Sequence, residues 1–180
     1  YKVLYDLGLV EQDEPPQRLC LDLYAPTGAH KDIGLQFQYL GEQLEALEHP
    51  GITRIHETGT ANTGKGQQHF VVADYIDGIS LIESIHRHPP SHEDRITLVR
   101  ELCDIVMYAH CHGVVHGDLR PGTIFISEDG QIHVIDFGIA MALDLNHSLA
   151  SSLDVGNVVS ADLFRSPESF DGTLDTRSDV

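Results

Sequence analysis

The sequence contains no tryptophan, two methionines and three lysines in 180 residues, and no apolar run approaches the ~20 residues that a membrane-spanning helix needs. The first residues also lack the basic and then apolar layout of a signal peptide. Cysteine is scarce and odd in number, and Cys20, Cys103 and Cys111 lie in apolar runs without a CxxC motif. Such thiols favour a reducing compartment over a disulfide framework. We therefore expect a cytoplasmic protein with no membrane segment in this stretch.

Positively charged residues are also scarce. Eleven Lys and Arg stand against 28 Asp and Glu, which gives a net charge of −17 at pH 7. This charge argues against nucleic acid and anionic lipid as partners, because their phosphate groups would be repelled. A hydrophobic content of 41% indicates a globular chain, and 180 residues can bury a core in one domain or two small lobes. The partners that we expect are other proteins.

The spacing of apolar residues predicts strands with one helix first, and then helices around a small hairpin. A helix is expected over residues 31–48, because its apolar positions recur every three or four residues, and His49-Pro50-Gly51 ends it. The other expected helices are 81–88 and 92–112, and the expected strands are 1–9, 18–25, 52–58, 68–75, 123–126 and 131–135. This order suits a two-lobed α+β fold.

Both ends of the chain suggest a piece of a longer protein. The chain opens on an expected strand, and it stops at 176–180 where a further helix would begin.

The chemistry is concentrated between Val114 and Gly138, in the stretch VVHGDLRPGTIFISEDGQIHVIDFG. Asp118 lies in an HxD loop, Thr123 follows five residues later, and Asp136 heads a DFG triplet after a short apolar strand. Two acids so placed suit phosphoryl transfer, since one can accept a hydroxyl proton and the other can hold magnesium on ATP.

This stretch resembles the catalytic core of eukaryotic-type serine/threonine protein kinases. The resemblance extends over nearly the whole chain, through landmarks that occur in the family's order. They are His49-Pro50 after the family's helix C, the hinge segment 70–81, Ser166-Pro167-Glu168 in place of the APE triplet, and Ser178-Asp179-Val180 at the helix whose aspartate braces the catalytic loop. The resemblance implies two lobes. The small lobe would be rich in β-strands and would cover residues 1–75 with the hinge, and the large lobe would be helical, incomplete and cover residues 76–180.

The resemblance also implies roles for individual residues. Asp118 would be the catalytic base, and Arg120 replaces the lysine that neutralises the transferred phosphoryl group. Asp136 would bind magnesium, and Thr123 stands where the family has the asparagine that binds a second magnesium, which puts that ligand in doubt. Gly117 replaces the arginine that in many kinases pairs with a phosphorylated activation loop.

The hinge would hold the adenine of ATP. Ala73 falls at the gatekeeper position, and Asp74, Tyr75 and Ile76 would face the base. ATP and magnesium are thus the cofactors that the resemblance implies.

The small lobe departs from the family's pattern. Alignment of RLCLDLYA on the VAIK-bearing strand places Asp22 where the lysine that holds the α- and β-phosphates should be, and Leu40 falls at its helix C glutamate partner. The glycine-rich loop is absent, because residues 9–16 read LVEQDEPP. A carboxylate beside a phosphate ~4 Å away would cost about 4 kcal/mol near a protein surface.

Three alternatives to this alignment stay open. Asp22 could face solvent after a register slip of one residue, and a shift of two residues could restore the glutamate at Glu42. Lys2 or Arg18 could replace the lost lysine.

Two other patterns imitate known sites. Gly59 to Lys65 resembles the start of a Walker A motif, but Gly66 replaces the required Ser or Thr, so a hairpin turn is expected. His110, His112 and His116 imitate a metal cluster, but residues 110 and 112 do not face the same way on a helix, so we expect no zinc.

Three functions follow from the residues. The first is a pseudokinase, a scaffold or regulator with weak or absent ATP binding. The second is an active serine/threonine protein kinase that transfers the ATP γ-phosphate to a protein hydroxyl. The third is a small-molecule phosphotransferase, since HGD followed by IDFG also resembles the aminoglycoside and choline kinase group.

Overall fold

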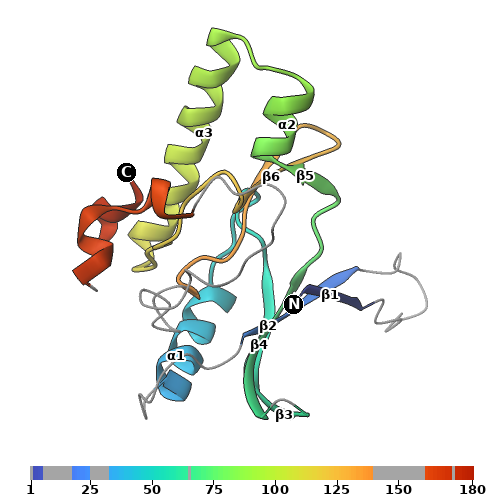
Figure 1. Cartoon of the computed structure of the whole chain (residues 1–180), viewed down its shortest axis with the longest axis vertical. Coiled ribbons are helices and arrows are strands. Elements are labelled where there is room, and N and C mark those ends of the chain that lie inside the picture. Colours follow the sequence, from blue (N-terminus) through green and yellow to red (C-terminus); the bar gives the residue numbers. More distant parts are fainter. Residues whose placement is uncertain (1, 6–17, 25–32, 65, 140–160, 172) are drawn as a thin grey trace.

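The computed structural model has an α+β architecture, with a four-stranded antiparallel sheet and one helix first, and helices around a three-stranded sheet next (Figure 1). The structure describes residues 2–5, 18–24, 33–64, 66–139, 161–171 and 173–180. Several expectations lie outside these residues. They concern the acidic segment 9–16, residues 31–32 of the first helix, and most of the segment between Gly138 and Ser166.

The first sheet has the strand order β1-β2-β4-β3. Its strands are β1 (Lys2–Tyr5), β2 (Leu19–Tyr24), β3 (Ile55–Thr63) and β4 (Gly66–Asp74). The register pairs Asp22 with Val71 on one side and with Lys2 on the other. β2 is therefore an interior strand, and its residues alternate between the two faces of the sheet.

Helix α1 (Ile33–Glu45) lies along this sheet (Figure 1). Phe37, Leu40 and Leu44 are buried on it at spacings of three and four residues, which is the apolar stripe that the sequence predicts. Its Gly41 backbone lies so close to Thr58 of β3 that a Cβ there would meet the threonine hydroxyl. The small residue thus permits the close approach of helix and sheet.

The second part contains two capped helices. Ser80 caps α2 (Leu81–Arg87), and Ser91 forms a capping box with Asp94 at the start of α3 (His92–Cys111). The second sheet contains β5 (Gly78–Ser80), β6 (Ile124–Ser127) and β7 (Ile132–Val134) in that order. Three short 3₁₀ helices end the described chain, η3 (Ala161–Phe164), η4 (Pro167–Asp171) and η5 (Thr176–Asp179), and they lie beside the C-terminal end of α3 (Figure 1).

A short seam joins the two parts. Ile52 forms a parallel bridge with Val134 of β7. The backbone N–H of Val134 donates to the Gly51 carbonyl at 2.8 Å, and the N–H of Thr53 donates to the Val134 carbonyl at 3.1 Å. The segment after α1 is thereby fixed to the strand that precedes the DFG triplet.

Most predicted elements are present, with shifted boundaries. The helices expected over 81–88 and 92–112 are confirmed to within one residue. The expected strand 52–58 begins only at Ile55, because residues 52 and 53 pair with β7 instead. β5 was not predicted, since its three residues are ordered by pairing with β6.

The expected hairpin between Gly59 and Lys65 is confirmed. β3 and β4 pair antiparallel as far as Thr63 and Gly66, so this segment does not lead into a helix. Gly66 has a φ of 99°, a left-handed conformation that suits glycine at a tight turn. In the described part of the chain, no helix has the length and apolar character needed to cross a membrane.

We predict that Gly51→Ala destabilises the fold by about 1–3 kcal/mol, since overpacking a buried site has costs of this size. A Cβ at position 51 would lie 2.4 Å from Cδ1 and 2.6 Å from Cγ1 of Ile105. Urea unfolding followed by circular dichroism measures the loss. Gly64→Ala is the control, because a Cβ there meets no atom within 4 Å. Equal stability of the two variants would contradict this account of the seam.

Candidate functional site

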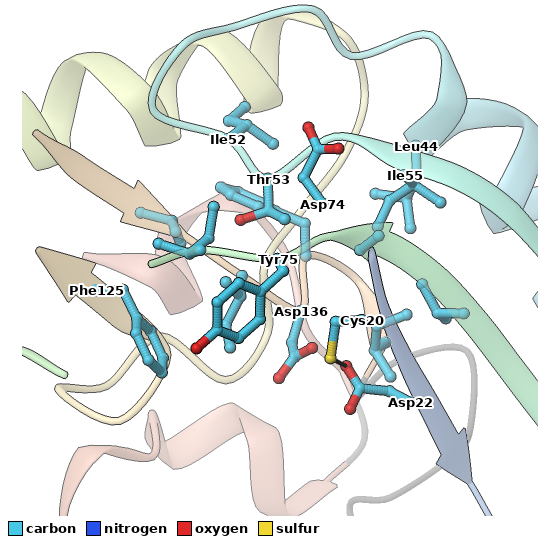
Figure 2. A pocket seen from close by; sticks show the side chains of 17 residues that line it. Cys20, Asp22, Leu44, Ile52, Thr53, Ile55, Asp74, Tyr75, Phe125 and Asp136 are labelled. Atoms are coloured by element: carbon cyan, nitrogen blue, oxygen red, sulfur yellow. Dashed lines mark hydrogen bonds between the residues drawn. The ribbon is translucent and has the colours of Figure 1, made fainter. Parts of the chain in front are cut away.

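A pocket lies between the first sheet and the β6–β7 hairpin, and has a volume of about 770 Å³ when its open mouth is included (Figure 2). The hinge residues Asp74, Tyr75 and Ile76 line it together with Asp136, as the resemblance implies. Its other lining residues are Cys20, Asp22, Leu44, Ile52, Thr53, Ile55, Val71, Ala73, Phe125, Val134, Ile135, Phe137 and Ile139. Most of this wall is apolar.

Asp22 lines this pocket and is 8% exposed. The thiol of Cys20, two residues earlier on β2, donates to its Oδ2 at 3.7 Å (Figure 2). The alternative in which Asp22 faces solvent is therefore wrong. The structure brings this carboxylate into the same pocket as Asp136.

Tyr24 adds a contact that the sequence analysis missed. Its hydroxyl donates to Oδ1 of Asp136 at 3.3 Å. Burial, and then the charges of Asp136 and Asp22, raise the pKa of Tyr24 well above its ordinary value, so the phenol stays neutral. Cys20, Asp22 and Tyr24 are every second residue of one strand. Because such residues lie on the same face of a sheet, this spacing could have indicated that the three side chains lie together.

Asp136 is held in an uncommon backbone conformation. Its φ is 66°, which is rare for a residue other than glycine, although aspartate tolerates it better than most. Two hydrogen bonds frame it: the Ile135 N–H donates to the Thr123 carbonyl at 3.0 Å, and the Gly138 N–H donates to the His116 carbonyl at 3.1 Å. The DFG triplet is thereby fixed to the HxD loop.

Asp118 and Arg120 form an ion pair within the HxD loop. Nε of Arg120 lies 2.9 Å from Oδ2 of Asp118. Gly122 leaves room for the guanidinium, since a Cβ there would lie 2.5 Å from one of its terminal nitrogens. The loop thus keeps a carboxylate and a cation together, next to the pocket rather than in its lining.

Thr123 is 1% exposed, and its hydroxyl is used within the loop. It accepts from the Arg120 N–H at 3.2 Å and contacts the carbonyls of Arg120 and Asp118 at 3.0 and 3.3 Å. A metal ion at this oxygen would have to displace these bonds. The geometry favours a role for Thr123 in shaping the loop.

His116 and Phe137 stack with ring centroids 4.7 Å apart. Nδ1 of His116 accepts from the Asp118 N–H at 3.1 Å, and Nε2 lies 3.0 Å from the Ile135 carbonyl, to which it donates in the neutral ring. Burial lowers the pKa of His116, which keeps the imidazole neutral. The ring therefore links the HxD loop with the DFG triplet.

Asp179 braces the same loop from far along the chain, as the resemblance implies. Its buried carboxylate accepts the N–H groups of His116 and Gly117, each at 2.8 Å. Nε2 of His110 also lies 2.8 Å from it. Of the three histidines that imitate a metal cluster, His110 thus contacts this carboxylate, while His112 contacts the Tyr108 carbonyl.

Leu40, at the position of the helix C glutamate, is buried and faces the DFG triplet. A Cβ on Gly138 would lie 2.6 Å from its Cδ1, so the leucine packs against that glycine. Glu42 is exposed. An apolar side chain therefore occupies the place from which a glutamate would reach the pocket.

Thr53 is the other residue that the sequence analysis missed. It is 7% exposed, and its hydroxyl has no hydrogen-bond partner among the described residues. It lines the pocket on the seam side (Figure 2). No sequence signal marks it, because its position depends on the pairing of residues 52 and 53 with β7.

Comparisons with known proteins agree with this geometry. A family model described as the protein kinase domain matches residues 40–180. The chain is 35% identical over 149 residues to the serine/threonine-protein kinase PknB of Mycolicibacterium smegmatis, and 30% identical over 152 residues to a probable serine/threonine-protein kinase PknB of Lactococcus lactis. These alignments cover 81% and 83% of the chain, but it spans only 23% of the length of each relative.

We predict that Asp179→Asn destabilises the protein by about 2–4 kcal/mol, because a carboxylate that accepts two backbone N–H groups is lost from a buried site. An asparagine can turn only one oxygen toward these donors. Chemical unfolding measures the change. Asp104→Asn removes the same charge from an exposed position on α3 and should leave stability unchanged. Equal effects of the two variants would contradict the bracing role.

We also predict that stability falls as pH drops from about 7 to 5. The folded-state pKa of His116 lies below the ordinary 6.5, and burial lowers that of His69 too, so the unfolded chain binds more protons in this window. Each histidine then contributes up to about 1.4 kcal/mol per pH unit. Urea unfolding at several pH values measures the slope.

A control separates this effect from general acid sensitivity. His116→Phe should reduce the slope, whereas replacement of the exposed His86 by Gln should not. If His116→Phe does not fold, NMR titration of the His116 ring in the unmodified protein gives the pKa directly. A value at or above 6.5 would contradict the prediction.

Proposed function

Because the chain belongs to the protein kinase domain family, we propose that it is a pseudokinase, a kinase-fold scaffold or regulator that binds other proteins and has weak or absent ATP binding. The observation that carries the proposal is the carboxylate of Asp22 in the pocket, at the position of the lysine that would hold the α- and β-phosphates. In a partly desolvated site this charge opposes a triphosphate rather than neutralising it.

The other residues of the pocket support the same reading. Among the residues whose side chains the structure describes, which exclude residues 2–5, no Lys, Arg or His lines the pocket, whereas Asp22, Asp74 and Asp136 do. Tyr24 donates a hydrogen bond to Oδ1 of Asp136, and the Thr123 hydroxyl is bonded to its own loop. These features support weak or absent binding of magnesium-bound ATP.

A second candidate is an active serine/threonine protein kinase. Asp118, Arg120 and Asp136 are retained, and the first two form an ion pair. Lys2 lies directly opposite Asp22 in the register of β1 and β2, which makes it the candidate for a substitute cation. Arg18 is less suited, because it is exposed and pairs with Asp77.

The remaining parts of the proposal concern organisation and location. We assign residues 1–75 to the small lobe with the hinge and residues 76–180 to part of the large lobe, with other proteins as partners and a cytoplasmic location. The seam at Gly51–Thr53 and the pocket between the two sheets support this division. In the described part of the chain, none of the three cysteines forms a disulfide, which supports a reducing compartment.

Binding of ATP to the full-length protein tests the proposal. A ligand at a hundred times its Kd stabilises the folded state by about 2.7 kcal/mol, which a thermal shift detects. We predict no magnesium-dependent shift at millimolar ATP, and no turnover by Asp22→Lys, since the glycine loop and the helix C glutamate are still absent. Phosphate transfer by that variant would contradict the proposal.

Lys2→Met separates the two candidates. If the unmodified protein shows a clear magnesium-dependent shift that Lys2→Met abolishes, the second candidate is correct and the pseudokinase proposal is wrong. The variant Asp104→Asn is the control for a general change in charge.

A further inference from the structure

Tyr24 joins the first sheet to the DFG triplet. It is the last residue of β2, where it pairs with His69 of β4, and its side chain packs against the core. Its hydroxyl donates to Oδ1 of Asp136 at 3.3 Å, across 112 positions of the chain. This hydrogen bond therefore ties a strand of the small lobe to the first residue of the triplet.

The direction of the Asp136 carboxylate is not set by the main chain. The backbone hydrogen bonds of Ile135 and Gly138 fix the path of the chain on both sides of Asp136. They do not fix the χ1 rotamer of its side chain. Among the residues whose side chains the structure describes, Tyr24 is the hydrogen-bond donor that reaches this carboxylate. The orientation of the carboxylate therefore depends on Tyr24.

The small lobe contacts the triplet at a second point. Leu40 of α1 packs against Gly138, where a Cβ would lie 2.6 Å from the leucine Cδ1. This apolar contact restrains the backbone of the triplet, but it offers no hydrogen bond to Asp136. The Tyr24 phenol differs, because it donates to a charged acceptor, and such hydrogen bonds are stronger than those between neutral groups.

We propose that Tyr24 is a positioning residue that holds the DFG triplet in its orientation from the small lobe, before any ligand binds. Its hydrogen bond sets the direction of the Asp136 carboxylate and joins β2 to this side of the pocket. Loss of the hydroxyl would let the triplet open locally while the rest of the fold stays intact. The inference goes beyond the proposed function, since it concerns the conformation of the site and not what the site binds.

Amide hydrogen exchange of the full-length protein without nucleotide tests the role. The N–H groups of Gly138 and Ile139 are both hydrogen-bonded and report on the triplet. In Tyr24→Phe both should exchange about tenfold faster, because a hydrogen bond to a charged acceptor is lost and the triplet opens more often. The amide of the buried Val106 on α3 should keep its protection. Tyr39→Phe is the control, since it removes a hydroxyl from an exposed position of α1 and should change none of the three amides.

A double-mutant cycle assigns the effect to the pair. Asp136→Ala removes the acceptor, so Tyr24→Phe should change the exchange rates by less than about twofold in this background. If Asp136→Ala does not fold, Asp136→Asn takes its place. The hydrogen bond is then between neutral groups, and the effect of Tyr24→Phe should fall to about threefold or less.

Three results would overturn the proposal. They are unchanged exchange of Gly138 and Ile139 in Tyr24→Phe, an equal rise at Val106, which would show a loss of overall stability alone, and an undiminished effect of Tyr24→Phe when Asp136 is replaced. The outcome is independent of the ATP experiment, because the exchange is measured without nucleotide. A magnesium-dependent ATP shift would refute the pseudokinase proposal and leave these exchange rates as they are.

Discussion

The pairing of Gly51–Thr53 with Val134 is the constraint on which the site depends. It joins the segment that follows α1 to the strand that ends two residues before Asp136. The two segments are far apart in sequence, and the pairing brings Ile52 and Thr53 into the same pocket lining as Val134. Gly51 lies close to Ile105, and Thr53 is buried at the same seam.

The negative charge in the pocket does not depend on this pairing, because Asp22 of β2 contributes to it. An interior strand offers no freedom to turn a single side chain outward, because a slip of one residue would exchange the whole face. Asp22 therefore lies on the same face of the sheet as Cys20 and Tyr24. The HxD loop and the DFG triplet of the family are kept, while β2 places the carboxylate of Asp22 in the pocket.

The sequence alone predicts the fold well and the site in part. The α+β class, helices α2 and α3, the β3–β4 hairpin and the bracing by Asp179 were all predictable, because each has a local pattern or a family landmark. The roles of Tyr24 and Thr53 were not, since both depend on contacts between segments distant in sequence. The same holds for β5, which is too short to show a period and exists by pairing with β6.

The contact between Asp179 and the HxD loop also has a consequence for the order of folding. The residues that it joins are 62 and 63 positions apart, so the N–H groups of His116 and Gly117 have no carboxylate until the chain has been made through residue 179. During synthesis from the N-terminus, the loop that carries Asp118 would therefore be completed only after residue 179 has been added. A ribosome that pauses within the intervening segment would expose an unfinished loop, a point at which chaperones could recognise the nascent chain.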